Sequence, residues 1–240
     1  MKNWFLRGLL AGIRTERPPT GDVSTSLSPG LPKTTSHSTQ ERALALTAAC
    51  PTRAIEAAEA TARVNEDRCV LCMRCKGDDG QDWRQDVIWA HPPDLNARGA
   101  LAGRFARSLH VRIVDAGDCG SCLSELAQMN GPSYNLHRFG IFITPTPRQA
   151  DVLLVVGPGT RQMHDALRAA YQAMPEPKRV VAVGACAASG GVFGPSPMSS
   201  GGIAEVIPVD LVVPGCPPPP LAIVDALRFI CGQSQRVSRP

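Results

Sequence analysis

The chain has 240 residues, enough for one or two domains that each bury a core. Its net charge of +4 is modest, Lys and Arg form no long block, and only 5% of residues are aromatic, so a nucleic-acid-binding surface is not expected. The unusual feature is nine cysteines, an odd number that excludes complete disulfide pairing. They indicate either a secreted scaffold with a free thiol or thiols that hold metal.

The N-terminal segment favours the second of these alternatives, thiols that hold metal. An apolar stripe from Trp4 to Ile13, interrupted by Arg7, is too short to span a bilayer, which takes about 20 residues. It has no small-residue cleavage site, so it is not typical of a secretory signal. We expect an amphipathic helix that packs on a partner or lies on a membrane surface. The chain is therefore expected in the cytoplasm, where cysteine clusters usually bind metal or carry out redox chemistry.

Composition then divides the chain. Residues 1–40 hold the amphipathic helix and a Pro- and Ser-rich linker, residues 41–98 a small cysteine-rich domain, and residues 105–240 a larger domain. In the larger domain, short β-branched runs alternate with amphipathic stretches, which predicts an α/β domain with a mostly parallel sheet. The predicted strands are 109–115, 140–145, 151–157, 179–185 and 210–215, and the predicted helices are 122–129, 161–174 and 219–230.

Three cysteines of the small domain, Cys69, Cys72 and Cys75, are each three residues apart. This spacing is typical of a ligand run for a [4Fe–4S] cluster, whereas zinc sites more often use separated Cys-x-x-Cys pairs. In bacterial ferredoxins such a run continues to a Cys-Pro that serves a second cluster, but here Asp79 and Gly80 stand at those positions. The run predicts an iron–sulfur site, with zinc or an incidental group of cysteines as the alternative.

The fourth ligand is found upstream, where Cys50-Pro51 matches the end of a first ferredoxin motif. The other three positions of that motif are Gln40, Ala43 and Leu46, so the ligands of one cluster are missing from both motifs. Four ligands of the other cluster remain. We therefore predict one [4Fe–4S] cluster in a ferredoxin-like α+β domain, held by Cys50, Cys69, Cys72 and Cys75.

A second set of cysteines follows the predicted strands of the larger domain. Carboxyl ends of parallel strands share one edge of a sheet, so four thiolates are expected to converge there. Glycine beside a cysteine lets the backbone turn tightly at such a site. The four are Cys119, Cys122, Cys186 and Cys216. A thioredoxin-like redox pair at Cys119 and Cys122 is the alternative, although it leaves the other two unexplained.

Two further groups of side chains carry weaker signals. Cys231, in the last predicted helix, has no partner motif and is expected to be a plain buried thiol. The histidines show no spacing typical of metal ligands, so we expect them on the surface or packed. They include His91, His110, His137 and His164.

Several stretches of the larger domain match one family in order: residues 119–125, 134–140, 147–151, 174–178, 184–191 and 207–218. They resemble the small, cluster-bearing subunit shared by respiratory complex I, where it is the 20 kDa subunit, and membrane-bound [NiFe] hydrogenases. The resemblance implies a flavodoxin-like fold with one [4Fe–4S] cluster, whose ligands here would be Cys119, Cys122, Cys186 and Cys216.

The resemblance also indicates a branch. Complex I members carry adjacent cysteines at the first position, whereas hydrogenase members carry Cys-x-x-Cys, as at Cys119 and Cys122. This favours the hydrogenase branch, and formate-hydrogenlyase-type complexes in particular. The first half resembles the two-cluster ferredoxin subunit of the same complexes, which begins with a similar amphipathic helix. The chain thus looks like a fusion of two subunits, with the ferredoxin half reduced to one cluster.

This resemblance implies an electron-transfer subunit with two [4Fe–4S] clusters and no catalytic metal of its own. Its expected partners are a large [NiFe]-type catalytic subunit, the membrane subunits of the complex at the inner face of the cell membrane, and a formate dehydrogenase or ferredoxin as electron donor. The alternatives are a quinone-reducing complex I-like subunit and a subunit of a related complex that lacks nickel. Glu125 has two open interpretations: a group on a proton path, or a first-turn carboxylate favoured by the helix dipole.

Overall fold

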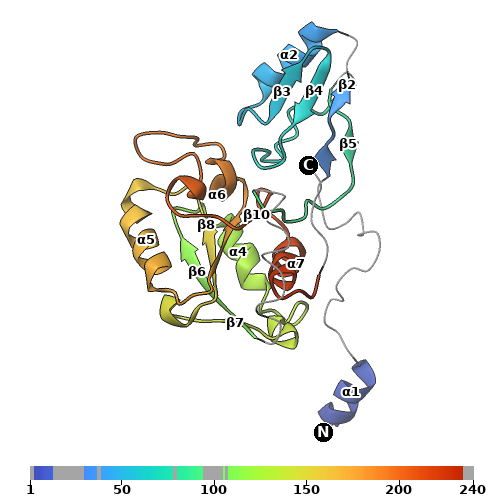
Figure 1. Ribbon diagram of the computed structural model, residues 1–240. Coiled ribbons are helices and arrows are strands. Elements are labelled where there is room, and N and C mark those ends of the chain that lie inside the picture. The colour runs from blue at the N-terminus through green and yellow to red at the C-terminus, as the bar shows by residue number, and fades with distance from the viewer. Residues whose placement is uncertain are drawn as a thin grey trace.

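Figure 1 shows the fold in a computed structural model, which describes residues 3–12, 30–36, 39–77, 80–93, 105 and 108–234. Asp79, most of the predicted linker and the boundary between the two cysteine-bearing domains lie outside these ranges. Within them, the chain forms a small antiparallel part followed by an α/β part (Figure 1). This confirms the predicted fold class.

The α/β part is built on a five-stranded parallel sheet with the strand order β10-β9-β8-β6-β7. Numbered along the chain, this is the order 2-1-3-4-5 of the flavodoxin-like fold, in agreement with the prediction. All five strands lie where the apolar runs predicted them, and most are shorter by one to three residues. They are β6 (Leu109–Asp115), β7 (Ile141–Ile143), β8 (Val152–Val156), β9 (Arg179–Val183) and β10 (Leu211–Val213).

Helices cover both faces of this sheet because alternate strand residues are apolar on both sides. From β8, Leu154 packs into a core with the helices α4 and α7, whereas Leu153 and Val155 pack into a second core with α5 (Figure 1). The predicted helix 161–174 begins as a 3₁₀ turn at Arg161–Met163 before α5. The helices are α4 (Ser121–Gln128), α5 (His164–Ala173), α6 (Ala185–Ser189) and α7 (Pro220–Ile230).

The small part contains the helix α2 (Gln40–Ala49) on a three-stranded antiparallel sheet of order β2-β4-β3. Its apolar core is small and consists of Ala43, Leu46, Ile55 and Ala62. A separate two-stranded sheet pairs β1 with β5. The strands are β1 (Leu31–Pro32), β2 (Thr35–Ser36), β3 (Ile55–Ala58), β4 (Thr61–Val64) and β5 (Trp83–Arg84).

Two of these strands correct the predicted linker. β1 and β2 fall within residues 1–40, where composition predicted only the amphipathic helix and a Pro- and Ser-rich linker. Each is two residues long, too short to show a period of two in the sequence. Each pairs with a strand far along the chain, β1 with β5 and β2 with β4, so tertiary pairing and not local pattern creates them.

The N-terminal helix α1 (Trp4–Ala11) lies apart from the rest of the described chain (Figure 1). It presents large exposed apolar side chains at Trp4, Phe5, Leu6, Leu9 and Leu10. This agrees with the predicted amphipathic helix. None of the helices in the described ranges is long and apolar enough to cross a bilayer.

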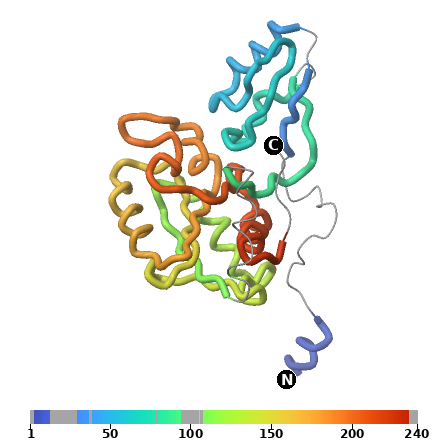
Figure 2. Tube along the Cα trace, viewed as in Figure 1, coloured from blue at the N-terminus to red at the C-terminus, as the bar shows by residue number. Residues whose placement is uncertain are grey.

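The two parts meet where the chain leaves β5. The segment after β5 runs down to the α/β part and passes beside β10 (Figure 2). There His91 forms an isolated antiparallel bridge with Val212 of β10. The cysteine-rich part is therefore joined to the edge of the parallel sheet by backbone hydrogen bonds.

Candidate metal centres

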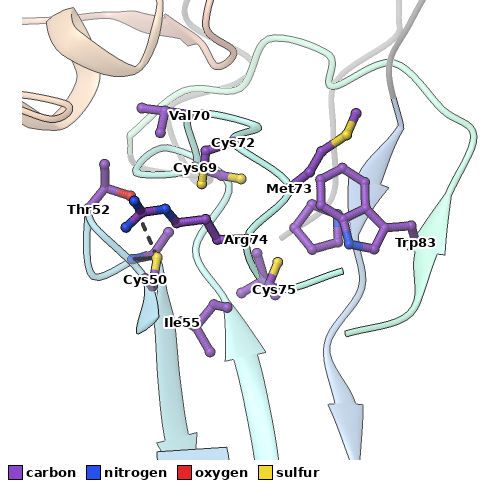
Figure 3. A pocket seen from close by; sticks show the side chains of 13 residues that line it. Cys50, Thr52, Ile55, Cys69, Val70, Cys72, Met73, Arg74, Cys75 and Trp83 are labelled. Carbon is purple, nitrogen blue, oxygen red and sulfur yellow. Dashed lines mark hydrogen bonds between the residues drawn. The ribbon is translucent and has the colours of Figure 1, made fainter. Parts of the chain in front are cut away.

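The first four cysteines surround one pocket of the small part. Cys50 follows the end of α2, and Cys69, Cys72 and Cys75 lie on the loop after β4, so that all four line the same pocket (Figure 3). Apolar side chains provide most of the remaining lining, including Pro32, Ile55, Val64 and Val70. The structure thus brings together the four residues predicted from the ferredoxin spacing.

The loop that carries three of these cysteines has an unusual backbone. Leu71 has a φ of 53° and Met73 a φ of 62°, in the left-handed region that bulky residues rarely adopt. Left-handed residues interspersed along a loop turn successive N–H groups toward one side, forming a concave site of the type that binds phosphate and Fe–S groups. Such strain persists only where the surroundings require it, commonly at functional sites. The backbone therefore fits a bound cluster.

The sulfur atoms are held in a partly buried setting. Cys50 Sγ accepts a hydrogen bond from the Ala54 N–H at 3.2 Å. Burial raises the pKa of the Cys69 thiol to about 11 and also raises the pKa of Cys75. At neutral pH, Cys69 and Cys75 would therefore hold their protons unless a cation replaced them, so metal binding here should release protons.

A tryptophan adds a donor to this pocket. Trp83, from β5, lines it, and its Nε1 is buried with no hydrogen-bond partner (Figure 3). Burial raises the pKa of the Cys75 thiol, and the Trp83 side chain, directed toward that sulfur as a donor, lowers it by a smaller amount. A buried N–H without an acceptor is costly. Sulfur of a bound cluster or of the Cys75 thiolate is the acceptor that the pocket would supply.

The positions of the lost cluster now contribute to the helix α2 and the small core. Gln40, Ala43 and Leu46 all lie on α2, where Ala43 and Leu46 are buried. At the other motif, Gly80 replaces the ferredoxin proline, and a Cβ at this position would collide with the Cys75 carbonyl oxygen. The segment that would have held one set of ligands is therefore used for packing.

The second four cysteines lie past the carboxyl ends of three parallel strands. Cys119 and Cys122 follow β6, with Cys122 buried in α4, whereas Cys186 lies in α6 after β9 and Cys216 follows β10. The turn that carries Cys119 is fixed by Asp118, whose carboxylate accepts a hydrogen bond from the Gly120 N–H at 2.8 Å. This is the edge at which flavodoxin-like sheets bind their ligands.

Glycines let the sulfur atoms of this second set approach the backbone. A Cβ at Gly184 would lie 2.7 Å from Cys122 Sγ, and one at Gly191 would lie 2.7 Å from Cys186 Sγ. Gly184 has φ 90° and ψ 160°, a conformation essentially restricted to glycine. The space next to these two sulfur atoms therefore exists only because both positions lack a side chain.

The thiols of this set influence one another. Burial raises the pKa of Cys122 well above its ordinary range and that of Cys186 to about 11, and it raises the pKa of Cys216 as well. In each case the next causes are the charges of neighbouring members of the set and of Asp118. The four side chains are thus close enough to repel one another when ionised, and a cationic metal group would relieve this repulsion.

No group of three or more His, Cys, Asp or Glu side chains in the described ranges is close enough to hold a single metal ion.

Cys231 is buried in the core beside α7, as predicted, and burial raises the pKa of its thiol to about 11. Glu125 is half-buried on α4, three residues after Cys122.

Sequence reasoning missed three features of these sites. Trp83 lies outside any cysteine motif, and its role depends on the pairing of Trp83 with Pro32 in two-residue strands. The left-handed conformations of Leu71 and Met73 have no sequence signal, because neither residue type favours positive φ. Gly191 could have been found, since it stands in a Gly-Gly pair five residues after Cys186.

The fold and the two cysteine sites define the class of protein. It is a flavodoxin-like protein with four thiols at the carboxyl edge of its parallel sheet and a further group of four thiols in the small part that precedes the sheet. Comparison with known proteins adds the family. The family described as NADH ubiquinone oxidoreductase, 20 Kd subunit, matches residues 119–230. The chain is 43% identical over 131 residues to the probable membrane-bound hydrogenase subunit mbhJ of Pyrococcus furiosus, covering 54% of this chain and 78% of that protein.

Two further relatives represent different complexes. Formate hydrogenlyase subunit 7 of Escherichia coli is 40% identical over 135 residues, which cover 56% of this chain and 53% of that protein. NAD(P)H-quinone oxidoreductase subunit K of a Picosynechococcus species is 47% identical over 107 residues, 44% of each chain. The chain thus spans about half the length of these two relatives.

The chain belongs to the family of the 20 kDa subunit of NADH-ubiquinone oxidoreductase. It is accordingly a small electron-transfer subunit of oxidoreductase complexes of the hydrogenase and complex I kind. These relatives match between 44% and 56% of the chain, and the family match begins at residue 119.

Proposed function

We propose that the chain is an electron-transfer subunit of a membrane-associated [NiFe] hydrogenase of the formate-hydrogenlyase type, fused to a ferredoxin-like domain that has kept one cluster. Two [4Fe–4S] clusters are its cofactors. The domains are those given by composition: 1–40, 41–98 and 105–240. Its partners are a large catalytic subunit, the membrane subunits of the complex, and a formate dehydrogenase or ferredoxin as electron donor, at the cytoplasmic face of the cell membrane.

The observation that carries this proposal is the division of eight cysteines into two separate sites within one chain. Cys50, Cys69, Cys72 and Cys75 would hold the first cluster, and Cys119, Cys122, Cys186 and Cys216 the second. A [4Fe–4S] cluster supplies one-electron transfer. The chain's own residues supply ligands, burial and N–H donors, which set the potential of such a group.

The choice of branch rests on the cysteine spacing. Sequence identity does not separate the branches, because relatives from hydrogenases and from a quinone oxidoreductase are similarly close. The Cys-x-x-Cys at Cys119 and Cys122 favours the hydrogenase branch over a quinone-reducing subunit. Glu125, one turn after Cys122, is the proposed proton-path residue if the large subunit packs against α4.

Iron and sulfide analysis tests the cluster count. Full-length chain purified without oxygen should contain about eight iron and about eight acid-labile sulfide per chain, four of each per cluster. The matched control is the chain with Cys231→Ala, which should contain the same amounts because Cys231 belongs to neither site. About four of each would contradict the second cluster, and zinc without sulfide would contradict both.

The sequence and metal content of the large subunit test whether the complex is a [NiFe] hydrogenase. If the chain is co-purified with its large partner, two Cys-x-x-Cys pairs in that partner and bound nickel are expected, together with hydrogen oxidation by a dye acceptor. A partner without the cysteine pairs and without nickel would reject the hydrogenase. It would favour instead the related complex that lacks nickel, or the quinone-reducing alternative.

Trp83→Phe should lower the reduction potential of the N-terminal cluster. The change replaces the indole with a smaller aromatic ring and removes the buried N–H, and an N–H that donates to sulfur stabilises the more negative reduced state. A hydrogen bond of about 1 kcal/mol corresponds to about 40 mV for one electron. A redox titration followed by EPR measures this shift, with the second cluster as internal control. An unchanged potential would show that the Trp83 N–H does not reach the sulfur atoms.

A further inference from the structure

One polar junction ties the small part to the α/β part. Asp67, in the turn after β4, lies with its Oδ1 2.8 Å from His91 Nε2, and its carbonyl oxygen accepts a hydrogen bond from Ser189 Oγ at 3.1 Å. The Ser189 hydroxyl also lies 3.0 Å from the Ala185 carbonyl oxygen. His91 and Val212 exchange two backbone hydrogen bonds, at 2.9 and 2.8 Å.

His91 is suited to join both parts in its charged form. Its Nε2 faces the Asp67 carboxylate and its Nδ1 lies 3.2 Å from the Pro92 carbonyl oxygen, so acceptors flank both nitrogens. Only the imidazolium donates to both at once. Burial alone would lower the pKa of His91, but Asp67, Pro92 and Glu66 together outweigh it and raise the pKa. Arg84 pairs with Glu66 at 2.8 Å, and the charged side chains of Lys33, Glu56 and Arg63 line the same pocket as His91.

The pair is more than a surface contact. The His91 side chain is 19% exposed and that of Asp67 33%, so water only partly screens their attraction. Ion pairs between fully exposed side chains contribute little, whereas a partly buried, hydrogen-bonded pair contributes more and is costly to break. The junction should therefore hold the two parts in one arrangement.

Each contact of the junction lies close in sequence to a proposed cluster ligand. Asp67 is two residues before Cys69, Ser189 is three residues after Cys186, and Val212 is four residues before Cys216. The turn of Asp67 is also fixed to its own part, since the Cys69 N–H donates to the Glu66 carbonyl oxygen at 3.3 Å and Glu66 pairs with Arg84 at 2.8 Å. A displacement of Asp67 would thus move Cys69 as well.

We propose that Asp67, His91 and Ser189 are positioning residues that fix the separation between the two cysteine sites. This inference rests on the proposed function in assigning a cluster to each site, whereas the junction itself is a property of the chain alone. Because the rate of electron tunnelling falls steeply with distance, loosening the junction would slow electron exchange between the two cysteine sites. The junction would thereby make one continuous relay of two parts that resemble separate subunits.

Amide hydrogen exchange of the full chain tests the junction without reference to clusters. In His91→Ala, the loss of a charge-assisted hydrogen bond should make the amides of residue 91 and Val212 exchange about tenfold faster. His91→Gln keeps a side-chain N–H for Asp67 and should restore most of the protection. His110→Ala is the matched control: His110 Nδ1 lies 3.4 Å from Asp151 Oδ2 within the α/β part, so its loss should leave both amides unchanged.

EPR of the fully reduced chain tests the spacing. His91→Ala and Ser189→Ala should keep both cluster signals but weaken the magnetic interaction between them, whereas His110→Ala should keep the interaction. Unchanged exchange at residue 91 and Val212 in His91→Ala would overturn the junction, and an unchanged interaction would overturn its role in spacing. A chain that binds no iron would contradict the proposed function, while the exchange measurement would still decide on the junction.

Discussion

If the two proposed clusters are present, replacing Gly184 with alanine is expected to abolish the C-terminal one, reducing the iron content from about eight to about four per chain. The added Cβ would lie 2.7 Å from Cys122 Sγ, closer than such atoms can approach. The backbone at φ 90° and ψ 160° adds strain of about 1–3 kcal/mol for any residue with a side chain. The proposed ligand Cys122 would therefore have to move, or the loop after β9 would.

The matched control separates backbone strain from the contact with sulfur. Gly194 also has a positive φ, 60°, but a Cβ there would have no heavy atom within 4 Å. Gly194→Ala should therefore cost some stability and leave the iron content near eight, while EPR of Gly184→Ala should retain the N-terminal signal alone. If Gly184→Ala kept both clusters, Cys122 would not be held against this glycine in the loaded protein.

The larger part of the fold could be predicted because its strands are buried on both faces. Such strands appear in the sequence as continuous apolar runs, and β8, with five buried residues, is the clearest of them. The order of the strands follows from short connections that alternate with helices. Strand ends were less predictable, since β7 stops before Thr144-Pro145 and β10 before Pro214-Gly215, residues that the predicted strands included.

The cysteine sites were predictable as sets, since spacing and strand ends are local properties. What could not be predicted is the environment of the sulfur atoms. Trp83 reaches the first pocket through the pairing of β5 with β1, two strands that have no pattern of their own. The positive φ of Leu71 and Met73 arises from the loop as a whole. Only the three-dimensional structure supplies these.

The junction between the two parts could be predicted from the sequence even less than the surroundings of the sulfur atoms. His91 was expected to be a surface or packed residue, and it is half-buried. Nothing in the sequence indicated the residues that it contacts. Its partners are Asp67 and Val212, and Ser189 is 122 residues from Asp67 along the chain. No short motif links such positions, so the contact that joins the two cysteine sites emerges only on folding.

Cys72→Ala should remove the EPR signal of the proposed N-terminal [4Fe–4S] cluster and leave the signal of the proposed second cluster unchanged. Cys72 is exposed, so its side chain contributes little to packing, and the small core of Ala43, Leu46, Ile55 and Ala62 does not include it. Removing one of four thiolates leaves one iron without its protein ligand. The variant therefore tests ligation with little loss of folding free energy.

Cys231→Ala is expected to lower stability and to leave both EPR signals in place, the reverse of the result expected for Cys72→Ala. Cys231 is buried in the α/β core, so its loss should cost about 1 kcal/mol of stability, measured by urea unfolding, while both EPR signals remain. The two variants thus separate the thiols that bind metal from the one that packs. Loss of both signals in Cys72→Ala would contradict two independent sites. The cores under the two sites are separate: α2, β3 and β4 form one, while Val87 and Ala90 of the segment after β5 pack into the core of the α/β part.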